Sequence, residues 1–331
     1  MPVEVERSAL IEVNQLIKSF EDVTAVDMIS FTVRKGELFG FLGPNGAGKT
    51  TTINMLTGLA RPDSGTITIA GLDCSKNLKV AQHLIGVVPD ESNLYPELSG
   101  YDNLCFCAAL YGMPKSERQD RAHELLETFD LQDAAQRKFA AYSKGMKRKL
   151  TIAAGIIHCP QILFLDEPTS GIDVASARQI RRLIAHLHSS GTTIFLTTHY
   201  IEEAERLCER IAFIVNGKIV RSDTVSNLLQ PIKQKNAMLI TVSNTEKTLI
   251  ANLMNAFPHL EFMAVSNERI RIESPEVIHI GPLVRFIEEG DAEVLEARRI
   301  QPSLEEVFVQ ITGIELEAMR REKERGGGSN R

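Results

Sequence analysis

The sequence predicts an α/β fold with a largely parallel sheet, followed by a smaller α+β domain. Three observations lead to this prediction. Strand-like and helix-like segments alternate through most of the 331-residue chain, a glycine-rich turn joins an early strand to a helix, and the pattern changes after Pro231. Such alternation is typical of parallel sheets whose strands are joined by crossover helices. A chain of this length is expected to form about two domains.

The first domain is expected to span residues 1–230. Its expected strands are short apolar or alternating runs at 11–17, 29–33, 37–42, 66–70, 85–88, 162–165, 193–197 and 211–215. Its expected helices have apolar residues three and four positions apart, at 51–59, 101–111, 117–129, 146–158, 174–188 and 201–208. Ser116 and Gln119 resemble a capping box at the start of one of these helices. The long helical stretch predicts a helical insertion at about residues 97–160.

The second domain is expected to span residues 231–313. Strands are expected at 238–242, 261–265, 270–272 and 294–297, with helices at 247–256 and 277–289. This β-α-β-β-α-β order is that of a split βαβ unit. A last helix is expected at 303–312, where Ser303 and Glu306 resemble a capping box. Residues 314–331 are charged and glycine-rich, and we expect them to form a flexible tail.

Composition excludes several classes of partner and location. The net charge of −6 leaves no broad basic surface, so nucleic acid is not an expected partner. No apolar run approaches the ~18 residues needed to cross a bilayer. The first ten residues lack the basic and apolar regions of a signal peptide. The five cysteines, at 74, 105, 107, 159 and 208, are scattered without zinc spacing, so we expect structural thiols in a reduced, cytosolic setting.

The glycine-rich turn has the pattern of a phosphate-binding loop. It consists of Gly43, Pro44, Asn45, Gly46, Ala47, Gly48, Lys49, Thr50 and Thr51. The glycines let backbone N–H groups turn toward phosphates without Cβ clashes. Lys49 is expected to reach the β- and γ-phosphates, Thr50 to offer its hydroxyl to Mg²⁺, and the following helix to point its positive end at the anion. The loop predicts binding of a nucleoside triphosphate with magnesium.

Two carboxylates, Asp166 and Glu167, follow the apolar strand 162–165. The carboxyl ends of central strands are where open α/β sheets bind their ligands. Asp166 suits Mg²⁺, which takes oxygen ligands. Glu167 is a candidate general base that polarises an attacking water.

These elements resemble the nucleotide-binding subunit of ATP-binding-cassette (ABC) transporters, over about residues 8–225. The segment 142–146, Tyr-Ser-Lys-Gly-Met, resembles the signature segment of that family, whose commonest form is Leu-Ser-Gly-Gly-Gln. The resemblance implies that Ser143 and Gly145 contact the γ-phosphate bound by the opposite subunit. It therefore implies ATP-dependent pairing with a second ATP-binding subunit, as a homodimer. The basic run Lys147-Arg148-Lys149 is expected to be a solvated face.

Three further segments match the family. Ser170-Gly171-Ile172-Asp173 resembles the D-loop, which crosses the dimer interface. His199 resembles the switch histidine, which contacts the γ-phosphate and the attacking water. Phe20 stands where the family places an aromatic ring that stacks on adenine, although a core phenylalanine is the alternative.

One position departs from the family. The loop after Val88-Pro89 usually carries a glutamine that touches Mg²⁺ and links the site to the transmembrane partner, and here Asp90 stands in its place. A carboxylate can still ligate Mg²⁺. We expect Asp90 to be a working substitute, against the alternative of a turn aspartate.

The resemblance implies a P-loop NTPase with an ABC ATPase core, a helical insertion and an accessory α+β domain. Residues 302–313 resemble the ending of drug- and antibiotic-efflux ATPase subunits. The implied protein is an ATP-hydrolysing motor subunit of an export-type ABC transporter. It would lie at the cytoplasmic face of the membrane, bound to a permease encoded as a separate chain. The alternatives are an importer subunit and an ABC ATPase that acts on ribosomes or DNA.

Overall fold

The computed structural model describes residues 8–233, 236–243, 247–290, 292–300 and 303–314. The chain divides into two compact units, of which the second is Val225–Gln310. The junction expected at residues 230 and 231 falls inside helix α8 (Val225–Lys233). The predicted flexible tail lies outside the described residues apart from Ile314.

A six-stranded sheet forms the centre of the first unit. Its strands, in spatial order, are β10 (Lys218–Thr224), β9 (Arg210–Val215), β3 (Leu38–Leu42), β8 (Thr193–Thr198), β7 (Ile162–Asp166) and β6 (Ile85–Val88). All neighbours are parallel except β10, which pairs antiparallel with β9. Every residue of β3, β7 and β8 is buried, as is typical of parallel strands covered on both faces. The predicted parallel α/β architecture is confirmed.

A second, antiparallel sheet lies in the same unit. It contains, in spatial order, β2 (Val23–Arg34), β1 (Ala9–Phe20), β4 (Ser64–Ile69) and β5 (Leu72–Asp73). One hydrophobic core joins the two sheets. Phe31 of β2 stacks on Phe39 of β3 with ring centroids 5.7 Å apart, and it also contacts Phe195 of β8 at 5.9 Å. Aromatic packing of this kind fixes the sheets against each other.

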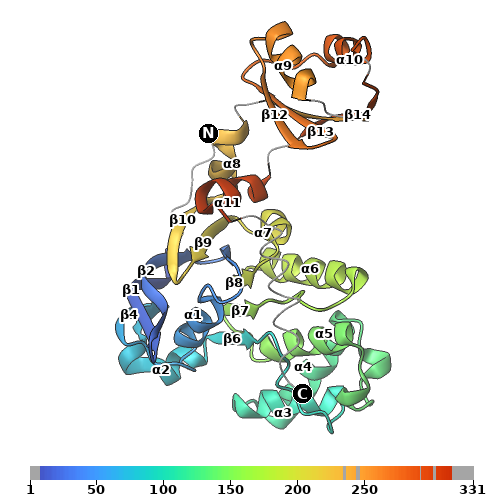
Figure 1. Ribbon diagram of the computed structural model, residues 1–331. Helices are drawn as coiled ribbons and strands as arrows, with labels where there is room; N and C mark the ends of the chain where they lie inside the picture. Colours follow the sequence, from blue (N-terminus) through green and yellow to red (C-terminus); the bar gives the residue numbers. More distant parts are fainter. Residues whose placement is uncertain (1–7, 234–235, 244–246, 291, 301–302, 315–331) are drawn as a thin grey trace. The chain divides into compact units, whose positions relative to one another are not determined.

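Helices surround these sheets and form the predicted insertion. The α-helices are α1 (Lys49–Leu56), α2 (Cys74–Gln82), α3 (Gly100–Leu110), α4 (Lys115–Thr128), α5 (Lys144–Gly155), α6 (Val174–Ser189) and α7 (Ile201–Leu207), and the 3₁₀ turns are Gln132–Ala134 and Phe139–Ala141. Figure 1 shows α3, α4 and α5 gathered beyond β6, on the other side of the sheet from β1, β2 and β4. The capping box at Ser116 and Gln119 is wrong, because α4 begins after Pro114 and no side chain caps it.

The second unit is a four-stranded antiparallel sheet with helices. Its strands, in spatial order, are β12 (Glu261–Ser266), β13 (Arg269–Ser274), β11 (Asn236–Val242) and β14 (Val294–Ile300). Its later helices are α9 (Lys247–Ala256), α10 (Ile280–Glu288) and α11 (Leu304–Thr312). The β-α-β-β-α-β order agrees with the prediction. Its core packs Ile240 and Ile270 of the sheet with Leu253 of α9 and Ile287 of α10. Across the described residues of both units, no helix is long and apolar enough to cross a membrane.

Candidate nucleotide site

The predicted phosphate loop lies between β3 and α1, where packing and backbone conformation both require glycine. Gly46 and Gly48 have left-handed φ angles of 76° and 103°. A Cβ at Gly48 would lie 2.4 Å from the carbonyl oxygen of Ala25, and one at Gly43 would lie 2.1 Å from that of Ile214. Larger side chains therefore cannot replace these glycines without moving a neighbouring strand.

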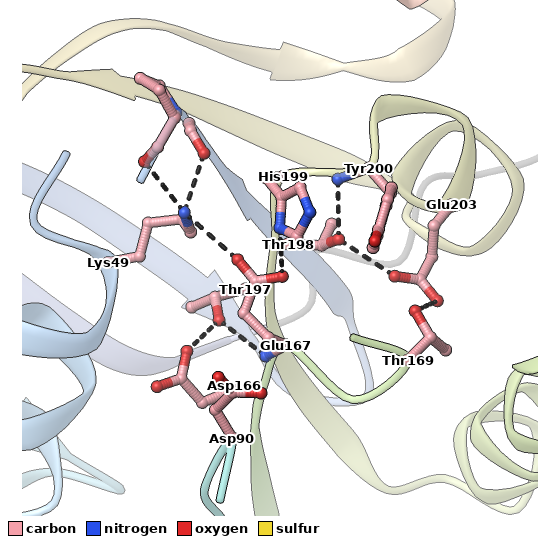
Figure 2. A network of polar contacts seen from close by, with 12 residues as sticks. Lys49, Asp90, Asp166, Glu167, Thr169, Thr197, Thr198, His199, Tyr200 and Glu203 are labelled. Carbon is pink, nitrogen blue, oxygen red and sulfur yellow. Dashed lines mark hydrogen bonds and ion pairs between the residues drawn. The ribbon is translucent and has the colours of Figure 1, made fainter. Parts of the chain in front are cut away.

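Lys49 begins α1, and its side chain turns back over the loop. Its Nζ donates to the carbonyl oxygens of Gly43 at 2.8 Å and Pro44 at 3.0 Å. The same Nζ forms an ion pair with Glu167 Oε1 at 3.2 Å, and Figure 2 shows these contacts together. The ammonium group is buried, and the loop and the end of β7 hold it in place.

The two carboxylates stand at the carboxyl end of β7. Asp166 lies opposite Thr197 of β8 in the parallel register, and the Thr197 hydroxyl donates to Asp166 Oδ1. Glu167 has a left-handed backbone with φ of 48°, and its N–H donates to the carbonyl oxygen of Thr197 at 3.1 Å. Such a conformation costs a residue with a side chain about 1–3 kcal/mol and is found most often at functional sites.

The side chain of Glu167 also contacts His199. The Nδ1–H of His199 donates to Glu167 Oε2 at 2.6 Å. Burial by itself raises the pKa of Glu167, but the His199 hydrogen bond and the Lys49 charge bring its pKa below the ordinary value. The carboxylate is therefore ionised at neutral pH. Its Oε1 faces Lys49 as an ion pair, without a hydrogen bond of good geometry.

A pocket of about 210 Å³ opens over these groups. Most of its lining was predicted from the sequence, namely Asn45, Gly46, Gly48, Lys49, Thr50, Thr51, Asp90 and Glu167. Ala25 lines it too and was not predicted. The lining combines backbone N–H groups, two hydroxyls and an ammonium group with two carboxylates, and this set suits a magnesium-bound phosphate chain.

Several predicted site residues do not line this pocket, among them Phe20, Ser143 and Gly145. Phe20 ends β1 with its ring half-exposed and the Lys18 ammonium 5.1 Å from the ring centre. Ser143 caps α5, because its hydroxyl oxygen accepts the N–H of Met146 at 3.2 Å. Gly145 packs against α6, where a Cβ would lie 2.3 Å from the Ser176 hydroxyl. The requirement for glycine at 145 therefore comes at least in part from helix packing.

The expected solvated face Lys147-Arg148-Lys149 is wrong for two of its three residues. Arg148 and Lys149 are buried on α5. Arg148 donates to the carbonyl oxygens of Pro89 and Asp90, both at 2.6 Å, to that of Glu167 at 3.3 Å, and to Asp90 Oδ1 at 3.4 Å. Burial lowers the pKa of Arg148, and the negative charges of Asp90, Asp166 and Glu167 counteract that lowering. Sequence patterns did not reveal this contact.

Comparison with known proteins identifies the family. The family model for ABC transporters matches residues 26–170. A linearmycin resistance ATP-binding protein of Bacillus subtilis is 35% identical over 92% of this chain and 98% of its own length. The chain belongs to the ABC transporter family. A doxorubicin resistance ATP-binding protein of Mycobacterium tuberculosis is 36% identical, over 88% of this chain and 89% of that protein.

Solved structures agree with this assignment. The ATP-binding subunit of an ABC transporter superposes with a TM-score of 0.62 at 29% identity, covering 68% of this chain and 93% of that one. A dimeric ATP-binding cassette in a post-hydrolysis state with ADP and phosphate gives 0.60 at 26% identity, covering 65% and 98%. This ABC protein is an ATP-binding subunit and an ATP hydrolase.

Proposed function

We propose that this ABC protein is the motor subunit of an exporter, driving a permease encoded as a separate chain. Its relatives support export, since the two described above are named for linearmycin resistance and doxorubicin resistance. A third, from Paraburkholderia xenovorans, is named for Nod factor export and is 35% identical over 93% of this chain. None of these three relatives is named as an importer subunit or as an ATPase that acts on ribosomes or DNA.

The C-terminal unit strengthens the export assignment. The solved cassettes cover 65–68% of this chain, whereas the resistance and export relatives cover 88–93% of it. Those relatives therefore share sequence beyond the cassette. We assign nucleotide binding to the first unit and an accessory role to Val225–Gln310.

The contact between Lys49, Glu167 and His199 is the observation that carries the proposed chemistry. In this proposal the loop residues 43–51 bind the phosphates through their backbone N–H groups, and Lys49 reaches the β- and γ-phosphates. The ionised Glu167 accepts a proton from the attacking water, and His199 holds that carboxylate in place and contacts the γ-phosphate. Phe20 stacks on the adenine ring.

Magnesium fits the oxygen groups around the pocket. Thr50 and Asp90 line it, and Asp166 is buried at the adjacent strand end with one oxygen bonded to Thr197. No cluster of three or more His, Cys, Asp or Glu side chains that could hold a metal occurs in the described part of the chain. A site of one or two carboxylates completed by phosphate oxygens is the usual arrangement for Mg²⁺, which supplies charge neutralisation to the phosphates.

A second copy of the chain completes each site in this proposal. Ser143 and Gly145 stand at the start of α5, away from the pocket of their own chain. A helix N-terminus with a hydroxyl suits a γ-phosphate presented by another subunit. Binding to the permease would place the protein at the cytoplasmic face of the membrane.

Replacing Glu167 tests the chemistry. Glu167→Gln should retain ATP binding and lower the turnover rate by about 10²–10⁴, the usual range for loss of a general base. Glu202→Gln, the same change at an exposed position on α7, should hydrolyse ATP like the parent. Normal hydrolysis by Glu167→Gln would refute the assignment and make His199 the next candidate.

Affinity purification from solubilised membranes should recover a polytopic permease.

A further inference from the structure

A buried carboxylate that the proposed chemistry does not use lies behind the Glu167–His199 pair. Glu203, on α7, is only 3% exposed. Its Oε1 accepts the hydroxyl of Thr169 at 2.8 Å, and its Oε2 accepts the hydroxyl of Thr198 at 3.1 Å. Figure 2 shows Glu203 reaching both threonines from its helix. Each oxygen therefore holds a different segment of the chain.

Those two segments carry the residues assigned to hydrolysis. Thr169 follows Glu167 by two positions in the loop after β7, and Thr198 ends β8 directly before His199. Glu167 and His199 contact each other at 2.6 Å. Three hydrogen bonds and two short stretches of backbone therefore form a closed ring. It runs from Glu167 through His199, Thr198, Glu203 and Thr169 back to Glu167.

Burying the carboxyl group of Glu203 costs more than burying an apolar side chain, so the arrangement needs a reason beyond packing. The pKa of Glu203 is raised above its ordinary value, because burial and the charge of Glu167 raise it more than the two threonine hydrogen bonds and the charge of Arg181 lower it. A buried carboxylate is tolerated where hydrogen bonds compensate its desolvation, and hydroxyl-to-carboxylate bonds are directional. An apolar side chain could fill the same volume but could not fix the two loops to each other.

We propose that Glu203 is a positioning residue for ATP hydrolysis. By holding Thr169 and Thr198 together, it keeps the loop of Glu167 and the end of β8 at the spacing that the Glu167–His199 bond requires. The proposal rests on the roles assigned above to Glu167 and His199. Displacement of a reacting group by about 1 Å can cost ~10²-fold in rate, so loss of Glu203 acts on turnover without touching the nucleotide.

Kinetics of matched variants test this role. Glu203→Ala should lower kcat for ATP by about 10–100-fold and leave KM within about twofold of the parent. Glu203→Gln should recover most of kcat, because its amide can bond both hydroxyls. Glu202→Ala is the control on the same helix, since its side chain is 70% exposed and its ion pair with Arg206 contributes little. Equal kcat in Glu203→Ala and the parent would overturn the proposal.

NMR tests the geometry independently of turnover. The imidazole N–H of His199 in its bond to Glu167 should give a slowly exchanging down-field proton resonance in ¹⁵N-histidine-labelled protein. Glu203→Ala should remove it, and Glu202→Ala should retain it. A retained resonance in Glu203→Ala would overturn the role of Glu203, whereas normal hydrolysis by Glu167→Gln would instead overturn the proposed function. If Glu203→Ala does not fold, Thr169→Val and Thr198→Val each remove one hydroxyl donor, and each should weaken the same resonance.

Discussion

Removing the Arg148 guanidinium should destabilise the first unit and free the Asp90 loop. Arg148→Met keeps a long side chain in the same space and removes every donor. The carbonyl oxygens of Pro89, Asp90 and Glu167 then lose the guanidinium that bonds them in the parent. Because the Arg148 side chain is only 7% exposed, water does not readily take its place at the Glu167 carbonyl.

The expected loss in free energy of unfolding follows from the separate contacts of Arg148. A hydrogen bond from a charged donor contributes about 1.5–3 kcal/mol, and leaving a buried acceptor unpaired costs about 1–3 kcal/mol. The Asp90 side chain is 53% exposed, so its ion pair with Arg148 adds only about 0–1 kcal/mol. Removing the guanidinium also removes the cost of burying its charge, and this offsets part of the lost stability. We expect a net destabilisation of about 2–4 kcal/mol, which lowers Tm by about 4–16 °C for a unit of this size.

Differential scanning calorimetry measures this change, because it can separate the transitions of the two units. The matched control is Lys144→Met, which removes a charge from an exposed position at the start of the same helix. The control should unfold within about 1 °C of the parent, since surface changes are usually within ±0.5 kcal/mol. If Arg148→Met also unfolds within that range, the four contacts of Arg148 contribute no net stability and the reasoning fails.

Two further predictions concern the metal and the shared sites. Asp90→Ala should raise the Mg²⁺ concentration for half-maximal ATPase activity by about 10-fold and weaken stimulation by the permease. Asp90→Asn should show the same defect more mildly. If both variants titrate with Mg²⁺ like the parent, Asp90 is a turn residue only. Lys49→Ala and Ser143→Arg should each abolish hydrolysis alone, yet mixing them should restore some activity, because one site of a mixed dimer carries neither defect. Verified mixed dimers without activity would instead indicate sites that each chain completes alone.

The strand ends and the loop were predictable because their signals are local. A glycine pattern between a strand and a helix specifies the loop conformation. Parallel pairing brings the carboxyl ends of β7 and β8 to one edge, so Asp166 and Thr197 meet once both strands are recognised. Glu167 directly follows β7 and His199 directly follows β8, so both stand at this same edge of the sheet.

The buried charges were not predictable, because sequence patterns do not tell which face of a polar run turns inward. In Lys147-Arg148-Lys149 each residue points in a different direction from the helix axis, and packing of α5 near the end of β6 buries two of them. Glu203 follows Glu202 in the first turn of α7, where acidic residues are common for their interaction with the helix dipole. Only the tertiary structure distinguishes the buried one from the exposed one.

Helices with weak or interrupted signals were missed for a related reason. Helix α2 contains a non-helical residue, Asn77, and few buried residues, so its apolar periodicity is poor. Helix α8 includes Pro231, which predicts a boundary because proline lacks the N–H that continues a helix. In both cases the context of the fold outweighs the local preference.

Two buried polar side chains, Arg148 and Glu203, bond the segment that contains one strained residue, Glu167. Glu167 holds a left-handed backbone that costs about 1–3 kcal/mol, so its surroundings must stabilise it. Arg148, from the helical insertion, bonds its carbonyl oxygen, while Glu203, from α7, bonds Thr169 two residues further on. The Thr197 backbone accepts its N–H. The conformation of Glu167 therefore depends on three elements outside its own strand, α5, α7 and β8, and α5 also holds the Asp90 loop. A shift of α5 against the sheet would move the Glu167 carbonyl contact and the Asp90 loop together, because one guanidinium bonds both.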